Sequence, residues 1–441
     1  MPQNLSVPRA IFLMTIAFLG IFVYGLLAAL PGSVLPTLER NQFLPNDSTV
    51  ATFLLINAIG AVVAYLVSGP IIDRLGKKIA LVFGTGLVIA SMSGFAVTVS
   101  KITPSSALVW IFACSLALGL GANAIVAAGH ALVVDVAASW RNAALNLLDI
   151  CFGLGLASLP LVVQTLQRRR GLPSIFWMLT GLSIVLLLLV TLSAFPRSAH
   201  SETSPVGAAG SLFRNTSFLL LAIALFMYVG AEVSVGKWVV TFMERDPRIL
   251  ASHGLTPDRV AAIANMSPDS LTRFFETDGL GYSIAGYALT TLTLFAMALL
   301  AGRLASSLLL GVLKVNSFLL ITVGSLLTTI ALVIAFTADT AAVVRLGLMV
   351  AGFGMGPVFP TSVGLASVMM PRIAGTAMSL VMGVGFAGLL IIPPAVGYIS
   401  SALGGATGDV RSGLMAVVVA SLLMLVLHFV LLLRERRGLG R

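Results

Sequence analysis

The sequence predicts an all-α integral membrane protein whose twelve transmembrane helices form two six-helix bundles. Of the 441 residues, 58% are hydrophobic and only 10% are charged, whereas an ordinary soluble domain is about 25% charged. Apolar runs long enough to cross a bilayer recur along the chain. A polar segment at residues 197–213, rich in Ser, Gly, Pro and Ala, divides these runs into two sets of six. The composition excludes a cytoplasmic enzyme, a secreted disulfide scaffold and a disordered regulator.

The apolar runs are predicted transmembrane helices because a helix needs about 20 apolar residues to cross about 30 Å of hydrocarbon. They are longer than the roughly ten residues of a barrel strand, and they do not alternate apolar with polar side chains. The first run is too long for a cleaved signal peptide and has no small-residue cleavage site. In order, the runs cover residues 10–36, 50–70, 79–99, 107–134, 143–166, 174–195, 214–242, 280–301, 315–336, 341–366, 373–400 and 412–433.

The positions of the runs predict the domain boundaries. Residues 1–196 form an N-terminal six-helix bundle, residues 197–213 a cytoplasmic linker, and residues 214–441 a C-terminal six-helix bundle with an outside loop at 243–279. A weak internal repeat of Gly-x-Gly pairs around an arginine relates the two halves, as in transporters that rock around a central site. Its members are Gly119, Gly121, Arg141, Gly153 and Gly155 in the first half, and Gly352, Gly354, Arg372, Gly383 and Gly385 in the second.

The outside loop carries two helix-start signals. Thr256-Pro257 and Ser267-Pro268 each place a capping hydroxyl just before a proline suited to the first helical turn. We therefore expect a small structured cap there.

Basic residues predict the orientation. The net charge is +10, and most Lys and Arg near helix ends lie in segments that face the cytoplasm if the N-terminus does. This arrangement anchors helices and gives no reason to expect nucleic-acid binding. The Arg168–Arg170 cluster falls on the outside and runs against the rule. We expect both termini to be cytoplasmic, in a multi-pass protein of the bacterial inner membrane.

One short motif carries a family resemblance. Between the second and third runs the chain reads Gly69-Pro-Ile-Ile-Asp73-Arg74-Leu-Gly76-Lys77-Lys78. Its glycines permit close approach and unusual backbone angles. It resembles the signature cytoplasmic loop of the major facilitator superfamily, and so implies twelve helices, alternating access and a conformational latch.

The resemblance assigns the latch to Gly69, Asp73, Arg74, Gly76 and Arg141, with Asp73 engaging Arg141 and the start of the eleventh helix near Arg372–Gly375. In the second half Gly302-Arg303 remains, but Ser306 stands where the acid would be.

Three further stretches, at residues 226–238, 144–153 and 354–361, resemble the seventh, fifth and tenth helices of the fucose–galactose–glucose:proton symporter family and its sugar-permease relatives. The chain departs from that pattern at two positions: Asp149 stands where the relatives usually have His, and His130 where they have Asn. The resemblance implies a sugar carrier, while the departures leave its route of proton coupling open.

Three ionisable residues are candidates for ion coupling, because a charge at mid-bilayer costs about 2.5–3.5 kcal/mol and needs a partner or a cavity. Asp149 and His130 fall at similar predicted depth on neighbouring antiparallel helices. They can form a hydrogen-bonded pair, either for coupling or as a static packing bond. Glu232 lies deep in the seventh run, and Lys237 lies nearer the outside, where it can snorkel.

Neutral polar and aromatic residues fit a sugar better than a charged solute, because amides bond hydroxyls and aromatic faces contact C–H groups. Any one of them can instead be ordinary packing. The substrate-binding candidates are Tyr24, Asn57, Asn123, Asn146, Tyr228, Trp238 and Phe359.

These observations predict a secondary active transporter that moves a small neutral solute, a monosaccharide, coupled to a proton or sodium gradient. The alternative is an exporter of drugs or metabolites with the same fold. The sequence lacks a phosphate-binding loop and catalytic motifs, so we expect neither an enzyme nor a cofactor or metal site. The expected partners are the solute, the coupling cation and the lipid bilayer, with the protein a monomer.

Overall fold

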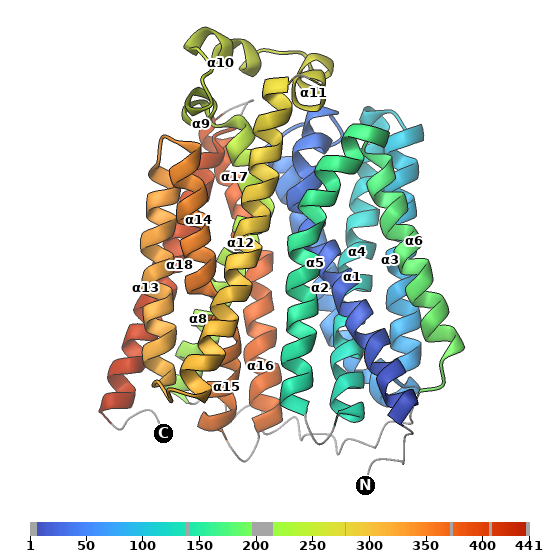
Figure 1. Cartoon of the computed structure of the whole chain (residues 1–441), viewed down its shortest axis with the longest axis vertical. Helices are drawn as coiled ribbons and strands as arrows, with labels where there is room; N and C mark the ends of the chain where they lie inside the picture. The colour runs from blue at the N-terminus through green and yellow to red at the C-terminus, as the bar shows by residue number, and fades with distance from the viewer. Residues whose placement is uncertain are drawn as a thin grey trace. The chain divides into compact units, whose positions relative to one another are not determined.

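The computed structural model describes residues 7–137, 141–195, 215–277, 279–370, 374–404 and 408–437, and every secondary-structure element within these ranges is helical. Twelve candidate spans in them are long and apolar enough to cross a membrane. The predicted fold class, a helical protein with twelve transmembrane helices, is therefore confirmed (Figure 1). The predicted linker at 197–213 lies outside the described residues.

The chain divides into two compact units. Unit 1 comprises Met1–Pro45, Thr52–Glu202 and Thr272–Asp278, and unit 2 comprises Asn46–Ala51, Thr203–Leu271 and Gly279–Arg441. The helices of the first half are α1 (Val7–Arg40), α2 (Asp47–Leu75), α3 (Lys77–Lys101), α4 (Pro104–Val136), α5 (Arg141–Arg170) and α6 (Pro173–Leu192).

Small residues let the helices of unit 1 pack closely. A Cβ atom on Gly25 of α1 would lie 2.3 Å from the carbonyl oxygen of Phe152, and one on Gly155 of α5 would lie 2.2 Å from that of Phe22. Each glycine thus meets the backbone of the other helix. Such contacts hold membrane helices together, because lipid gives apolar side chains no hydrophobic reason to associate.

In unit 2 the helix α8 (Thr216–Arg245) packs against most of the others. The remaining elements are α9 (Pro247–Ser252), α10 (Pro257–Ala264), α12 (Gly279–Gly311), α13 (Ser317–Thr337), α14 (Ala341–Met355), α15 (Val358–Met369), α16 (Ala374–Ala387), η2 (Gly388–Leu390), α17 (Ile392–Gly404) and α18 (Val410–Arg436). The helix α11 (Pro268–Glu276) has its last residues in unit 1.

Two predicted spans of unit 2 are interrupted helices. The run predicted at 341–366 breaks between α14 and α15 at Gly356 and Pro357, and the run at 373–400 breaks at η2, just before Pro393. Proline has no N–H to donate and its ring clashes with the preceding turn, so it interrupts the backbone ladder. Hydropathy alone shows the apolar length but not this break.

Three short helices, α9, α10 and α11, lie in the loop that was predicted to face the outside, where a small structured cap was expected (Figure 1). Thr256 caps α10 by accepting a hydrogen bond from the N–H of Arg259, as its sequence predicts. The helix α9 was not predicted, although Asp246-Pro247 is the same kind of signal. The Asp246 carboxylate accepts from the backbone N–H groups of Arg248 and Ile249 at 3.0 and 3.2 Å.

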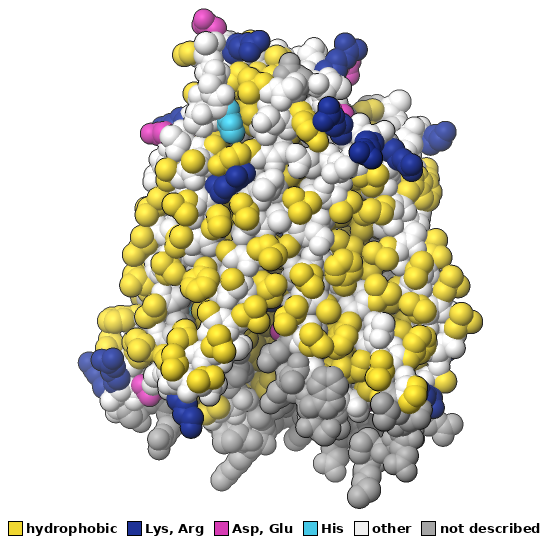
Figure 2. Space-filling model, in the orientation of Figure 1, with side chains coloured by type: hydrophobic (Ala, Val, Ile, Leu, Met, Phe, Trp, Pro, Cys, Tyr) yellow, Lys and Arg dark blue, Asp and Glu magenta, His cyan; other side chains and the backbone are white. Residues whose placement is uncertain are grey.

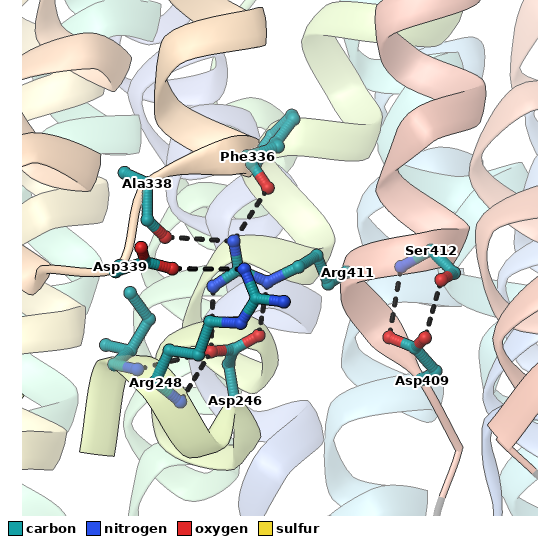
Figure 3. A network of polar contacts seen from close by, with 9 residues as sticks. Asp246, Arg248, Phe336, Ala338, Asp339, Asp409, Arg411 and Ser412 are labelled. Atoms are coloured by element: carbon teal, nitrogen blue, oxygen red, sulfur yellow. Dashed lines mark hydrogen bonds and ion pairs between the residues drawn. The ribbon is translucent and has the colours of Figure 1, made fainter. Parts of the chain in front are cut away.

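The C-terminal end of α8 is fixed by a polar network within unit 2 (Figure 3). The Arg411 guanidinium donates to both carboxylate oxygens of Asp246, at 2.6 and 2.8 Å, and to the carbonyls of Phe336 and Ala338 at 2.9 Å each. Arg248 pairs with Asp339 at 3.0 Å beside this cluster. The loop after α8, the α13–α14 connection and the start of α18 are thereby tied together.

The visible surface suits a lipid environment. Apolar side chains cover the middle of the face in Figure 2, while Lys and Arg gather toward its ends. Large apolar residues such as Leu66, Val109 and Leu192 are more than two-thirds exposed. Such a band is expected where helices face hydrocarbon.

Candidate functional site

Unit 1 contains a polar group beside two aromatic rings. The Tyr24 hydroxyl of α1 donates to Asn123 Oδ1 of α4 at 3.4 Å, and the Tyr24 ring stacks on Phe152 of α5 with centroids 5.4 Å apart. Asn123 is held in place by a bond from its Nδ2 to the carbonyl of Gly119 at 2.8 Å. Because the Tyr24–Asn123 bond is long, a solute hydroxyl could replace it at little cost.

The two other predicted asparagines differ from Asn123. Asn57 Nδ2 donates to the carbonyl of Ser115 at 3.0 Å, and the Ser115 hydroxyl donates back to the carbonyl of Phe53 at 3.0 Å. This reciprocal pair joins α2 to α4, so Asn57 contributes to helix packing. The side chain of Asn146 lies outside the described residues.

The structure does not join His130 to Asp149. His130 Nδ1 donates to the carbonyl of Val126, one turn earlier in its own helix, at 2.9 Å. No bond between the two side chains is found, although both are described and partly exposed. A proton on Nδ1 leaves Nε2 of a neutral ring as an acceptor. The predicted hydrogen bond between these two side chains is therefore not present in this structure.

Unit 2 contains an ion pair that the sequence did not predict. Arg303 of α12 places Nη2 3.8 Å from Glu232 Oε1 of α8, and the two side chains are 16% and 14% exposed. Tyr228 lies one turn before Glu232 on α8 and is fully buried. Its hydroxyl lies near both charges. The pair is therefore set inside the bundle and still reachable by a small polar molecule.

Aromatic rings adjoin this ion pair. The Phe359 ring of α15 lies 6.3 Å from that of Tyr228 and 6.1 Å from that of Phe386 on α16, between centroids. Phe359 and Phe386 are partly exposed. Unit 2 thus combines an apolar ring surface with a charged hydrogen-bonding pair, as unit 1 combines ring faces with a hydroxyl and an amide.

Trp238 has a packing role in this structure. It is fully buried, and its Nε1 donates to the carbonyl of Pro393 at 2.9 Å, which joins α8 to α17. A Cβ atom on Gly397 would lie 2.8 Å from the indole ring. The ring is therefore enclosed between helices of unit 2.

The predicted latch is described only in part. The surroundings of Gly69 and the side chains of Asp73 and Arg141 lie outside what the structure describes, and so does Arg372. Arg74 is exposed, and Gly76 has the positive φ of 89° that its motif position predicts. The assignment of the latch to these residues stays a prediction.

The lysines of the same motif have clear partners. Lys77 is buried and forms an ion pair with Asp135 near the end of α4. Lys78 donates to the carbonyls of Thr191 and Ser193 at 2.7 and 2.8 Å, which caps the end of α6. The basic end of the motif thus joins α3 to α4 and α6.

Sequence reasoning could have found Arg303 only indirectly. Arg303 belongs to the Gly302-Arg303 pair, which is what remains of the signature loop motif in the second half of the chain. That motif led us to expect Arg303 at a cytoplasmic helix end. Glu232 lies 71 positions earlier in the numbering, so nothing local links the two side chains. Their meeting depends on the rotation of α8 and α12 about their axes, which hydropathy does not determine.

Comparisons with known proteins agree with this architecture. The family model of the Major Facilitator Superfamily matches residues 17–393. An uncharacterized MFS-type transporter of Yersinia pestis is 23% identical over 414 residues, covering 91% of this chain and 93% of that protein. Among solved structures, a D-xylose-proton symporter has a TM-score of 0.72 at 14% identity, covering 94% of this chain and 97% of the other. A mutant of the nucleoside transporter NupG has a TM-score of 0.71 at 13% identity, with 96% and 99% covered.

Proposed function

Because the chain belongs to the Major Facilitator Superfamily, we propose that it is a secondary active transporter of a small neutral solute of the monosaccharide class. Transport proceeds by alternating access and is driven by a proton or sodium gradient. The observation that carries this proposal is the pairing of polar groups with aromatic rings in each unit: Tyr24, Asn123 and Phe152 in one, and Tyr228, Glu232, Arg303 and Phe359 in the other.

The chemistry of these groups fits a sugar. Hydroxyl, amide and guanidinium groups exchange hydrogen bonds with ring hydroxyls, and aromatic faces contact the C–H surface of a pyranose. Transporters built from two related repeats bind solute near the bilayer midplane with groups from both repeats. The fold resemblance to a D-xylose-proton symporter supports a monosaccharide as the solute. The fold resemblance to a nucleoside transporter supports a second, related solute class, in which the sugar is a ribose that carries a base.

The proposal includes an orientation and a location. We place both termini in the cytoplasm and the protein in a bacterial inner membrane as a monomer. The basic residues near helix ends support the orientation.

The exporter alternative has less support from this geometry. A carrier of lipophilic cations needs an acidic group in an apolar cavity. Glu232 has the Arg303 guanidinium 3.8 Å away, and a cationic solute would be repelled by that charge. Asp149 is the remaining acid that such an exporter would use.

Uptake into proteoliposomes tests the proposal. The purified protein is reconstituted, and labelled D-glucose, D-galactose and L-fucose are offered under an imposed pH gradient and, separately, a sodium gradient. Accumulation of one sugar above its outside concentration with one ion is the expected result. The absence of uptake under either gradient, together with no measurable binding of any of the three sugars, would refute a sugar symporter and favour the exporter.

A further inference from the structure

Arg345 is a charged residue inside a membrane-spanning helix, and no acidic side chain pairs with it. It lies four residues, about 6 Å, after Ala341, the first residue of α14. The sequence ranges of α14 itself and of α12 and α13, against which it packs, contain no Asp or Glu. Asp339, in the connection before α14, pairs with Arg248 at 3.0 Å. Among the described residues, the contacts of Arg345 are therefore with neutral groups.

The guanidinium of Arg345 is nevertheless held in one position by α12. Its Nε donates to the Thr291 hydroxyl at 2.9 Å, and its Nη2 donates to the Tyr287 carbonyl at 2.8 Å. The guanidinium carbon lies 3.2 Å from the centre of the Tyr287 ring, so the cation stacks on the ring face. An arginine has five N–H donors. The two on Nη1 and one on Nη2 have no partner among the residues that the structure describes.

His253 extends this cluster from the other side of the ring. The Ser252 hydroxyl accepts from the backbone N–H of Ala341 at 3.0 Å, which fixes the end of α9 at the start of α14. The next residue, His253, packs its ring against that of Tyr287, with centroids 5.3 Å apart. His253 Nε2 is buried and has no hydrogen-bond partner. A buried polar atom is normally satisfied by a protein group, by water or by an ion, so this nitrogen is available to a ligand.

The side chains that flank Arg345 on α14 are apolar and exposed. Val343, Leu346 and Phe353 are 41%, 62% and 44% exposed. They are three and seven residues apart, so they share one face of the helix. Met297 on the neighbouring α12 is 44% exposed. Such a face suits acyl chains, and the phosphates of a bilayer lie along the edge of an apolar band like the one in Figure 2.

We propose that Arg345, Tyr287 and His253 form a binding site for the phosphate group of a phospholipid, whose acyl chains lie along the exposed apolar side chains of α12 and α14. This inference does not rest on the proposed function, because these residues are not among the groups proposed to bind the solute.

The chemistry of the three residues fits a phosphate. A guanidinium fork donates to two phosphate oxygens at once, which an ammonium group cannot do in the same plane. The Tyr287 ring and the Thr291 hydroxyl already orient the fork, so little side-chain freedom is lost when the ligand binds. The neutral His253 ring with its proton on Nε2 can donate to a further oxygen.

The lipid, rather than a free anion, is favoured by the position of the charge. A cation at the edge of the hydrocarbon is costly unless an opposite charge is near, and basic groups between membrane helices bind lipid head groups for this reason. A free phosphate would bring the charge alone. A phospholipid also covers Leu346 and Phe353, and each methylene that it buries there adds affinity.

Lipid binding to the purified protein in detergent tests the site. Native mass spectrometry gives the dissociation constant of bound lipid, and tryptophan fluorescence gives the unfolding midpoint. Phosphatidylglycerol is compared with a diacylglycerol of the same acyl chains, which lacks the phosphate, and with inorganic phosphate, which lacks the chains. We expect phosphatidylglycerol to bind and to raise the unfolding midpoint, and the other two to do neither at the same concentration.

Arg345→Gln is the decisive variant. It is expected to weaken phosphatidylglycerol binding by at least about tenfold, because a charged hydrogen bond to the phosphate is lost. Arg345→Lys keeps the charge without the fork and should recover part of the affinity. Arg259→Gln, which changes an exposed arginine of α10, should bind the lipid like the wild type.

The Tyr287 ring is tested as a positioning group by two variants. Tyr287→Phe keeps a ring face under the guanidinium and should retain the affinity, whereas Tyr287→Leu removes the ring and should lower the affinity several-fold. A purely structural role of these side chains would lower the unfolding midpoint without lipid and leave the dissociation constant of phosphatidylglycerol unchanged.

Each contrary outcome overturns a stated part of the proposal. If diacylglycerol binds as tightly as phosphatidylglycerol, the site does not recognise phosphate. If inorganic phosphate protects the protein equally well, the ligand is a free anion and the lipid assignment is wrong. If Arg345→Gln binds phosphatidylglycerol like the wild type, the lipid lies elsewhere. If Arg345→Gln does not fold, the tyrosine variants decide, because equal affinities of Tyr287→Phe and Tyr287→Leu refute the site.

Discussion

The two arginines of Figure 3 provide a sharp test of how burial sets the strength of an ion pair. Arg411 and Asp246 are 14% and 7% exposed, whereas Arg248 and Asp339 are 61% and 70% exposed. Both pairs lie at the same end of unit 2 and within one network. We therefore expect Arg411→Gln to be far more destabilising than Arg248→Gln.

The structure gives the size of the difference. Removing Arg411 leaves Asp246 buried without its bidentate partner, and two carbonyls lose donors at 2.9 Å. Breaking such a buried pair costs about 3–5 kcal/mol. The exposed pair contributes about 0–1 kcal/mol, because water and salt already screen it. Asp246 also caps α9, so the loss of Arg411 should loosen that helix.

The assay is unfolding of the purified protein in detergent, followed by the fluorescence of its four tryptophans. The double variant Arg411→Gln with Asp246→Asn completes a cycle, and it should be less destabilised than the sum of its parts, because no buried charge remains unpaired. Equal unfolding midpoints for Arg411→Gln and Arg248→Gln, or additive effects in the cycle, would refute the reasoning.

Three other predictions concern pH, packing and the solute. Burial, and then the charge of Arg345, hold the pKa of His253 below its ordinary value. The unfolded chain therefore binds more protons than the folded protein below about pH 6.5. The free energy of unfolding should fall as the pH drops from about 7.5 through about 6.5 toward the pKa of the folded state. Gly155→Val places Cβ 2.2 Å from the carbonyl of Phe22 and should cost more than the usual about 1–3 kcal/mol of overpacking, because the obstacle is backbone; yield and unfolding midpoint report it. Tyr24→Phe removes one hydrogen bond worth about 1 kcal/mol and should raise the sugar KM roughly fivefold.

Each of these predictions has a matched control. His253→Gln should flatten the pH dependence of unfolding, and an unchanged slope would contradict the assignment. Gly181→Ala meets no atom within 4 Å, so it should leave stability intact where Gly155→Val does not. Trp238→Phe should lower stability and leave KM nearly unchanged, since the indole bonds Pro393 within unit 2; a KM effect as large as that of Tyr24→Phe would place Trp238 at the solute.

Local features were predictable from the sequence because their causes are local. Hydropathy over about 20 residues gives the spans, and a hydroxyl before a proline gives the start of α10. The positive φ of Gly76 follows from its place in a tight turn. In each case the residues that decide the structure are neighbours in the chain.

The polar partners were not predictable, because they depend on how each helix is rotated about its axis. His130 and Asp149 have similar predicted depths, yet His130 bonds to Val126 in its own helix. Asn57 and Trp238 have the composition of solute ligands, but their donors meet the carbonyls of Ser115 and Pro393. A sequence pattern predicts which face of a helix is apolar. It does not predict which partner a single buried polar side chain will meet.

The residue Ser306 offers a way to test why Arg303 turns toward Glu232. The first half of the chain has Asp73 in its signature loop, whereas the second half has Ser306, whose hydroxyl donates to the carbonyl of Arg303 at 2.8 Å. An acid at this position would lie three residues after Arg303 on the same helix, where opposite charges attract. It would compete with Glu232 for the guanidinium.

Ser306→Asp is therefore expected to weaken the pair of Arg303 with Glu232, and transport with it. Ser306 is 3% exposed, so the new carboxylate must pair with Arg303 or take a proton itself. Accumulation of sugar under the driving ion gradient should fall several-fold, and Ser306→Asn, which has the same shape without the charge, should keep it. If Ser306→Asp and Ser306→Asn lower accumulation equally, the effect comes from side-chain volume. The idea that two carboxylates compete for Arg303 is then refuted.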